Sequence, residues 1–239
     1  MSSSAWNPFG PAHFDPRKSE LRPSGLASKR IAVFFATREG HTQRVAERLT
    51  SDLLALGFDV DLLPAGQRPP FALANYCAAV LAASVHAGNH EKEMVEFVKD
   101  HRLELEGMPT AFLSVTLSEA GVEMPEKSAA ERASFANDVN TMLDKFYAET
   151  HWHPTVAKPV AGALLYTHYN FLVRLIMKRI ARKAGASTDT SRDHDYTDWV
   201  GLDKFADELA ATIRSAHLER SGAATSAEST GAQTQERHD

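Results

Sequence analysis

The stretch that decides the fold is IAVFFATREGHTQRVAERL, Ile31 to Leu49. Its first six residues form a nearly continuous apolar run, which is typical of a central parallel strand covered on both faces. Val45 and Leu49 then begin an apolar pattern at helical spacing. Between the two lies TREGHT, residues 37–42, which is small, polar and hydroxyl-rich. A strand, a polar loop and a helix in this order predict the first unit of an α/β protein.

Apolar runs alternate with helical patterns along the rest of the chain. We expect further strands at 58–62, 78–83, 111–115 and 160–165, and helices that include residues 45–56, 94–98, 133–146 and 202–213. Alternating strands and helices with short joints predict right-handed crossovers and a doubly wound parallel sheet of five strands. The ligand of such a sheet binds at the carboxyl ends of its strands.

Composition limits the class of protein. The chain has 239 residues with a formal net charge of −5, which does not favour nucleic acid as a partner. Its single cysteine, Cys77, excludes an intramolecular disulfide framework and a multi-cysteine metal centre. Residues 1–28 and 219–239 are expected to be disordered tails around a domain over 29–218. No secretory signal or membrane-spanning run is visible, so we expect a cytoplasmic protein.

The loop TREGHT is placed to bind an anion. A helix N-terminus offers unpaired N–H groups and a partial positive charge, Thr37 and Thr42 add hydroxyl donors, and Gly40 allows close backbone approach. The loop is neither a Walker A motif nor G-x-G-x-x-G, so the terminal phosphate of a mononucleotide fits better than a triphosphate or a dinucleotide. The alternative is an ordinary loop whose threonines only cap the helix.

T-x-[DE]-G-x-T after a first strand resembles the phosphate loop of flavodoxins, which bind FMN. The segments FLSVTL, WHPTVAKPVAGALLY, LIMK, TDT and YTDW, in this order, resemble the quinone-dependent protoporphyrinogen oxidase family of bacteria. The resemblance covers about Ile31 to Leu209. It implies a flavodoxin-like sheet of order 2-1-3-4-5, with an extra basic helix between the fifth strand and the last helix. It also implies FMN as cofactor and electron transfer from protoporphyrinogen, in heme biosynthesis, to a membrane quinone.

The resemblance implies two kinds of cofactor contact. The phosphate would be wrapped by Thr37, Arg38, Glu39, Gly40, His41 and Thr42. The isoalloxazine ring would lie against Ser84, Val85, His86, Ala87 and Gly88, within a segment that extends to His90, and against a second loop at Thr116 and Leu117. Alternatively, 84–90 is a turn that serves the next helix, and His41 points to solvent. We expect no catalytic protein residue, because the flavin carries the redox step, and no metal site, because His151 and His153 lack a third ligand.

A basic segment interrupts the flavodoxin pattern before the last helix, within an insert of about 166–198. Arg174, Lys178 and Arg182 form one helical stripe in Tyr166–Gly185, and no acid occurs between Thr150 and Thr188. We expect this helix to contact an anionic membrane at the inner face of the cell membrane, or to line a site for a lipid quinone and an acidic substrate. The alternative is a helix packed on the sheet with a solvated basic face. The sequence leaves the oligomeric state open.

Two departures from the family bear on the substrate. His86 and Ala87 stand where the porphyrinogen oxidases carry Arg and Tyr. The basic loop after their fourth strand is replaced by SEAGVEMPEKSAAERAS, which contains Glu119, Glu123, Glu126 and Glu131. Acidic groups disfavour the propionates of a porphyrinogen but leave the FMN site untouched. Three other functions therefore stay open: an FMN-dependent NAD(P)H:quinone oxidoreductase, a flavodoxin-type electron carrier, and a flavin-free regulatory domain.

Overall fold

The computed structural model describes residues 29–66, 72–164 and 193–216. Within them, the main sheet runs in the spatial order β2-β1-β3-β5-β6, with all four neighbouring pairs parallel. The strands are β1 (Arg30–Ala36), β2 (Asp59–Pro64), β3 (Ala78–His86), β5 (Thr110–Thr116) and β6 (Val156–Ala161). With β5 and β6 as the fourth and fifth strands, the expected order 2-1-3-4-5 is confirmed.

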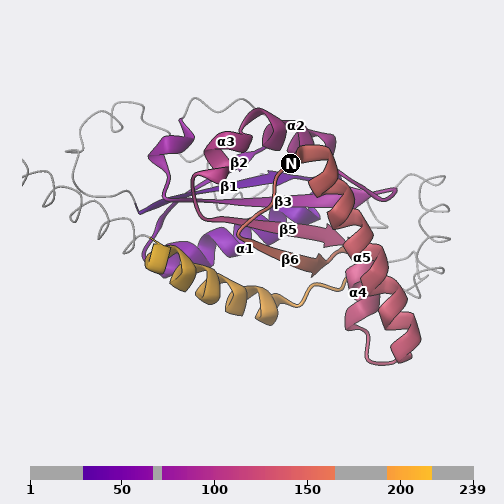
Figure 1. Cartoon of the computed structure of the whole chain (residues 1–239). Helices are drawn as coiled ribbons and strands as arrows, with labels where there is room; N and C mark the ends of the chain where they lie inside the picture. Colours follow the sequence, from indigo (N-terminus) through magenta and orange to yellow (C-terminus); the bar gives the residue numbers. More distant parts are fainter. Residues whose placement is uncertain (1–28, 67–71, 165–192, 217–239) are drawn as a thin grey trace, which may run out of the picture.

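Helices cover both faces of this sheet (Figure 1). They are α1 (His41–Ala55), α2 (Lys92–Asp100), α3 (Arg102–Glu106), α4 (Leu117–Glu123), α5 (Ala129–Thr150) and a helix over residues 199–216, with a short 3-10 turn η2 (Leu73–Asn75). Alternate residues of β1 enter two separate cores. Val33 packs with α1 and residues 199–216, whereas Phe34 packs with α2 and α5. Because both faces are covered, β1 reads as a continuous apolar run.

The end of α1 follows directly from its sequence. Gly57 adopts φ 88°, the left-handed conformation that glycine tolerates best. Its N–H donates to the carbonyl of Leu54 at 3.0 Å, and the N–H of Phe58 donates to the carbonyl of Leu53 at 3.2 Å. This is a Schellman cap, with buried Phe58 and Leu53 in the same core. Gly57 therefore ends the helix as expected.

The fifth strand differs from the expectation. β6 begins at Val156 and ends at Ala161, four residues earlier than the expected 160–165. Pro159 lies inside this strand, although proline lacks the N–H that a central strand needs. β6 lies at the edge of the sheet, where proline is tolerated. After Gly162, β7 (Ala163–Leu164) pairs antiparallel with β8 (His194–Asp195), so the chain returns to the end of β6.

Two other segments were wrongly expected to be loops. The β3 strand continues to His86, and β4 (Asn89–His90) pairs with it antiparallel. The acidic stretch after β5 is largely helical, because α4 starts directly at Leu117 and α5 starts at Ala129. A capping box forms at α5: Ser128 Oγ accepts from the N–H of Glu131, whose carboxylate accepts from the N–H of Ser128.

The expected tails, residues 1–28 and 219–239, lie outside the described residues. So does 165–192, which holds most of the expected insert; only 193–198 of the insert is described. The boundaries of the domain over 29–218 therefore stay a prediction. In the part of the chain that the structure describes, no helix is long and apolar enough to cross a membrane.

Candidate functional site

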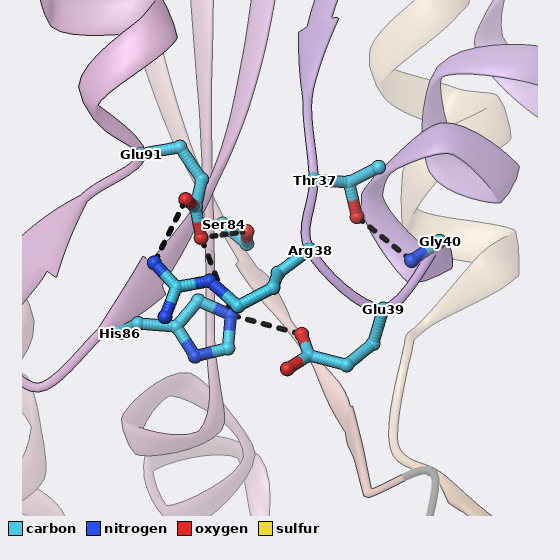
Figure 2. A network of polar contacts seen from close by, with 7 residues as sticks. All are labelled: Thr37, Arg38, Glu39, Gly40, Ser84, His86 and Glu91. Carbon is cyan, nitrogen blue, oxygen red and sulfur yellow. Dashed lines mark hydrogen bonds and ion pairs between the residues drawn. The ribbon is translucent and has the colours of Figure 1, made fainter. Parts of the chain in front are cut away.

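The loop between β1 and α1 is shaped by one glycine and one threonine. Gly40 adopts φ 88° at the N-cap of α1, a conformation that strains other residues. Its N–H donates to Thr37 Oγ1 at 3.0 Å (Figure 2). Because the Thr37 oxygen acts as acceptor here, its hydroxyl hydrogen is left for a ligand. The hydrogen bond between the Gly40 backbone and the Thr37 side chain thus holds the loop, and the Thr37 hydroxyl can still donate to a ligand.

The first turn of α1 contains buried polar atoms that nothing in the described residues satisfies. Thr42 is 1% exposed, and its Oγ1 has no hydrogen-bond partner there. His41 is 6% exposed, and its Nδ1 also has no hydrogen-bond partner in the described residues. An unsatisfied buried hydroxyl costs about 1–3 kcal/mol, so native proteins rarely keep one without a reason. Of these two atoms only the Thr42 hydroxyl can donate to an anion, and it lies at the N-terminus of α1, where backbone N–H groups also favour an anion.

His41 turns inward, so the alternative that it points to solvent is wrong. Its Nε2 lies 2.8 Å from Thr197 Oγ1, whose hydroxyl donates to the carbonyl of Ala161 at 2.7 Å. Since that hydroxyl hydrogen is already used, Nε2 is the donor and Nδ1 of the neutral ring is a bare acceptor. Burial lowers the pKa of His41; Asp195 opposes this shift and Arg44 adds to it. His41 is therefore neutral at neutral pH and does not bring positive charge to the loop.

Sequence analysis missed Asp195 and Thr197, at the end of the expected insert, as contacts of His41. Asp195 lies 3.8 Å from His41 Nε2 and 3.5 Å from Arg44 Nη2, and it accepts from the N–H of Thr197 at 3.0 Å. The YTDW motif was noted only as part of the family resemblance. Its contact with a loop 156 residues earlier could not be derived from local pattern.

A β-hairpin after β3 provides the second rim segment. Ala87 and Gly88 have φ of 49° and 77° and connect the paired residues His86 and Asn89, as in a type I′ turn. Gly88 therefore serves the turn. Ser84 and Val85 belong to β3 itself. The segment is thus the end of β3 and a hairpin turn before α2. Its contact with a flavin ring stays a prediction, as does the alternative that it only serves the next helix.

A polar network joins this hairpin to the phosphate loop (Figure 2). Glu91, which precedes α2, accepts from Arg38 Nη2 at 3.1 Å and from Ser84 Oγ at 3.2 Å. His86 Nε2 lies 2.9 Å from Glu39 Oε2 and 3.3 Å from Glu91 Oε1. The side chains of Arg38 and Glu39 are therefore directed toward the hairpin. Sequence analysis overlooked Glu91, since it resembles any acid near a helix start.

The end of β5 differs from the ring-binding loop that we expected. Thr116 is the N-cap of α4, and its Oγ1 accepts from the N–H of Ser118 at 3.2 Å. The same hydroxyl points to Met142 Sδ at 3.8 Å. With Thr116 5% exposed and Leu117 already helical, no loop separates β5 from α4. The hydroxyl of Thr116 is used inside the protein, so any ring contact here would come from other atoms.

The acidic residues after β5 lie in different surroundings. Glu131 is used in the α5 cap. Glu119 and Glu123 line a groove of about 460 Å³ with Lys158 and Phe205. Burial raises the pKa of Glu119, opposed by Lys158, and burial with Glu119 and Asp198 nearby raises the pKa of Glu123 to about 7. The shift of Glu123 reduces the negative charge of this groove at neutral pH.

The remaining predicted site residues, Arg174, Lys178 and Arg182, lie outside the described residues. Within residues 29–66, 72–164 and 193–216, no group of three or more His, Cys, Asp or Glu side chains is arranged to hold a metal ion.

Comparison with known proteins gives the class of this chain. A model of the flavodoxin domain matches residues 32–191. Solved flavodoxins align at low similarity: one from the domain Archaea has a TM-score of 0.43 and 11% identity over 77% of this chain and 99% of its own. A flavodoxin of Streptococcus pneumoniae TIGR4 has a TM-score of 0.42 and 18% identity over the same shares. The chain belongs to the flavodoxin domain family, which implies a flavin cofactor.

Two curated proteins are similar to this chain over about three quarters of its length. The chain is 34% identical to the protoporphyrinogen IX dehydrogenase [quinone] of Escherichia coli strain K12, over 74% of this chain and 93% of that protein. It is 29% identical to the protoporphyrinogen IX dehydrogenase [quinone] of Leishmania major, over 77% of this chain and 76% of that protein. These similarities agree with the family resemblance that the sequence motifs indicated.

Proposed function

We propose that the protein is an FMN-dependent oxidoreductase that passes electrons from protoporphyrinogen to a quinone. The observation that supports this most strongly is 34% identity to a protoporphyrinogen IX dehydrogenase [quinone] along 93% of that relative. The Thr42 hydroxyl at the start of α1 has no hydrogen-bond partner among the described residues, and a phosphate oxygen could supply one.

The proposed FMN site uses the rim at the carboxyl ends of β1, β3 and β5. The phosphate would accept from the hydroxyls of Thr37 and Thr42 and from N–H groups of the 37–42 loop. The ring would lie against the hairpin at 84–88 and the start of α4 near Leu117. When bound, FMN supplies two-electron oxidation and reduction. The protein itself binds, orients and shields it.

The substrate proposal rests on the relatives and on the basic segment. A porphyrinogen carries carboxylates, and Arg174, Lys178 and Arg182 could each meet one through a charge-assisted hydrogen bond. A quinone dissolved in lipid would be reached from the inner face of the cell membrane, with the same basic helix on the anionic surface. The acidic groove is a weaker objection than the sequence indicated, because the carboxyl of Glu123 is about half protonated at neutral pH.

A second candidate is an FMN-dependent NAD(P)H:quinone oxidoreductase. Glu119 and Glu123 keep it open, because acids in the segment where the porphyrinogen oxidases are basic weigh against a porphyrinogen as the electron donor. A flavodoxin-type electron carrier is a third candidate, which the basic segment disfavours. The three candidates share the cofactor and differ in the electron donor.

Anaerobic turnover separates these candidates. Flavin-loaded protein is mixed with a soluble quinone and either protoporphyrinogen or NADH, and reduction of the quinone is followed. We expect oxidation of protoporphyrinogen, which falls about tenfold or more in Arg174→Ala and Lys178→Ala if each cation contributes about 1.5–3 kcal/mol. Exposed Lys204→Ala removes the same charge elsewhere and should have no effect. Turnover with NADH alone would support the second candidate, and turnover with neither donor would support the carrier.

Vesicle sedimentation tests the membrane proposal separately. Each cation near an anionic surface adds about 1 kcal/mol, and salt weakens the attraction. We expect binding to anionic vesicles that fades at high salt and falls in the triple variant Arg174→Ala, Lys178→Ala, Arg182→Ala. Equal binding to neutral vesicles would exclude the electrostatic explanation.

A further inference from the structure

Glu91 has a buried carboxylate between two loops. Its side chain is 7% exposed, whereas its partner Arg38 is 62% exposed. A buried charge is stable only when it is paired and hydrogen-bonded. Glu91 meets this condition through Arg38 and Ser84, and His86 Nε2 lies 3.3 Å from the same carboxylate.

These partners come from separate parts of the chain. Arg38 belongs to the loop after β1, whereas Ser84 and His86 belong to β3 at the start of the hairpin. A second contact crosses the same gap in parallel, because His86 Nε2 also lies 2.9 Å from Glu39 Oε2. Figure 2 shows both contacts bridging the two ribbons. The loop and the hairpin are thus tied together by side chains at two consecutive residues, 38 and 39.

The tie is separate from the groups that can hold an anion. Thr37 and Gly40 bond to each other, and Thr42 Oγ1 has no partner in the described residues. The backbone of Glu91 is held independently, since its N–H donates to the carbonyl of Ser84 at 3.0 Å. A change in the carboxylate can therefore loosen the loop against the hairpin without removing an anion donor or displacing residue 91.

We propose that Glu91 is a positioning residue that fixes the phosphate loop against the hairpin, so that both ends of FMN meet a preformed site. This rests on the proposed function only in taking FMN as the ligand. A ligand that spans two subsites gains affinity from their connection when the spacing between them is held. If the spacing varies, ordering the two segments reduces the binding free energy of the ligand. Loss of the Glu91 carboxylate should therefore weaken the binding of FMN more than the binding of riboflavin or of phosphate alone.

The test compares three ligands: FMN, riboflavin and inorganic phosphate. Their dissociation constants are measured by calorimetry on the apo-protein for the wild type, Glu91→Gln and the control Glu96→Gln. Glu96 is an exposed acid within α2, and its ion-pair partner there is Lys92. We expect Glu91→Gln to weaken FMN about tenfold, while riboflavin and phosphate change less than about twofold. The visible circular dichroism of bound FMN should also change, since the ring is held less tightly.

A second variant protects the test against a folding defect. His86→Gln breaks the other contact across the gap and should give the same selective loss of FMN affinity. Its effect should be less than additive with that of Glu91→Gln, because both act through one network. Unchanged FMN affinity in both variants, or equal weakening of all three ligands, would overturn the positioning role. If the wild-type protein binds no FMN, it is the proposed function that fails.

Discussion

Two buried histidines show how differently this fold treats the same residue. His90 shares a hydrogen bond at Nε2 with Ser114 Oγ at 2.9 Å and packs against the rings of Phe112 and Phe146, which stack on each other. His41 is buried to the same degree but lies beside the unsatisfied Thr42 hydroxyl, and its own Nδ1 has no partner in the described residues. His90 thus completes a core, whereas His41 borders a site that a ligand would complete.

The contrast separates stability from binding. In the His90 cluster, removal of a polar partner should cost stability and leave ligand affinity unchanged. At the start of α1, removal of a polar group should cost ligand affinity and leave the apo-protein as stable as before, or more so. Each prediction below tests one side of this distinction.

The largest expected effect concerns acid sensitivity. Burial lowers the pKa of His90 from 6.5 to about 4. Above pH 6.5 the ring is neutral in both states; as the pH falls toward 4, only the unfolded chain gains the proton, so stability is lost. The free energy of unfolding falls by about 3 kcal/mol in this way. His90→Gln should therefore show a smaller fall in stability between pH 7.5 and 4.5, measured by urea unfolding, whereas exposed His153→Gln should fall like the wild type.

Thr42→Val tests the ligand side of the comparison. The substitution keeps the shape of the side chain and removes a hydroxyl that has no protein partner within the described residues. We expect FMN affinity to fall by about 1.5–3 kcal/mol, the usual value of a hydrogen bond to a charged group. The melting temperature of the apo-protein should stay unchanged or rise. A clear fall in that temperature would mean that the hydroxyl serves the fold.

Thr116→Val is the matched control at the next rim strand. Thr116 Oγ1 caps α4 by accepting from Ser118 N–H. Loss of such a cap costs about 1 kcal/mol. We therefore expect lower stability with FMN affinity within about twofold of wild type. A larger loss of FMN affinity would show that the Thr116 hydroxyl binds the cofactor, against the geometry.

The smallest effect concerns Glu123. Its pKa is raised to about 7, so the folded state holds a proton that the unfolded chain releases near pH 4.5, and stability falls as the pH rises between these values. Glu123→Gln should remove this penalty and raise the melting temperature at pH 8 but not at pH 4. Although neighbouring groups partly desolvate the Glu123 carboxyl, more than a third of the residue's surface is exposed, so solvent screens these interactions and the gain is about 0.5 kcal/mol at most. An equal gain at both pH values would exclude titration as the cause.

Local pattern was enough for most of the fold. The apolar run at Ile31, the helical spacing that starts at Val45 and the glycine at 57 each act within a few residues, so β1, α1 and its end could be predicted. Pro159 hid an edge strand, because its tolerance depends on a position in the sheet that sequence does not reveal. The direct β5–α4 connection was missed because Thr116 can serve as a loop residue or as a cap.

The candidate site was predictable where one loop carries the chemistry and not where distant segments meet. Thr37, Gly40 and Thr42 lie together in the sequence. Thr197 contacts His41 from 156 residues further along the chain, and Glu91 contacts Arg38 from 53 residues further along. Contacts of this kind form only when the whole sheet has brought the segments together, so no local motif predicts them.

Titration of the apo-protein with FMN and with riboflavin tests the central claim most directly, namely that the start of α1 binds the phosphate of a flavin mononucleotide. The two ligands differ only in that phosphate. Two or more charge-assisted hydrogen bonds predict that FMN binds at least about 100-fold more tightly than riboflavin. Thr42→Val should reduce this ratio. Equal affinities for the two ligands, or binding of neither, would contradict the account.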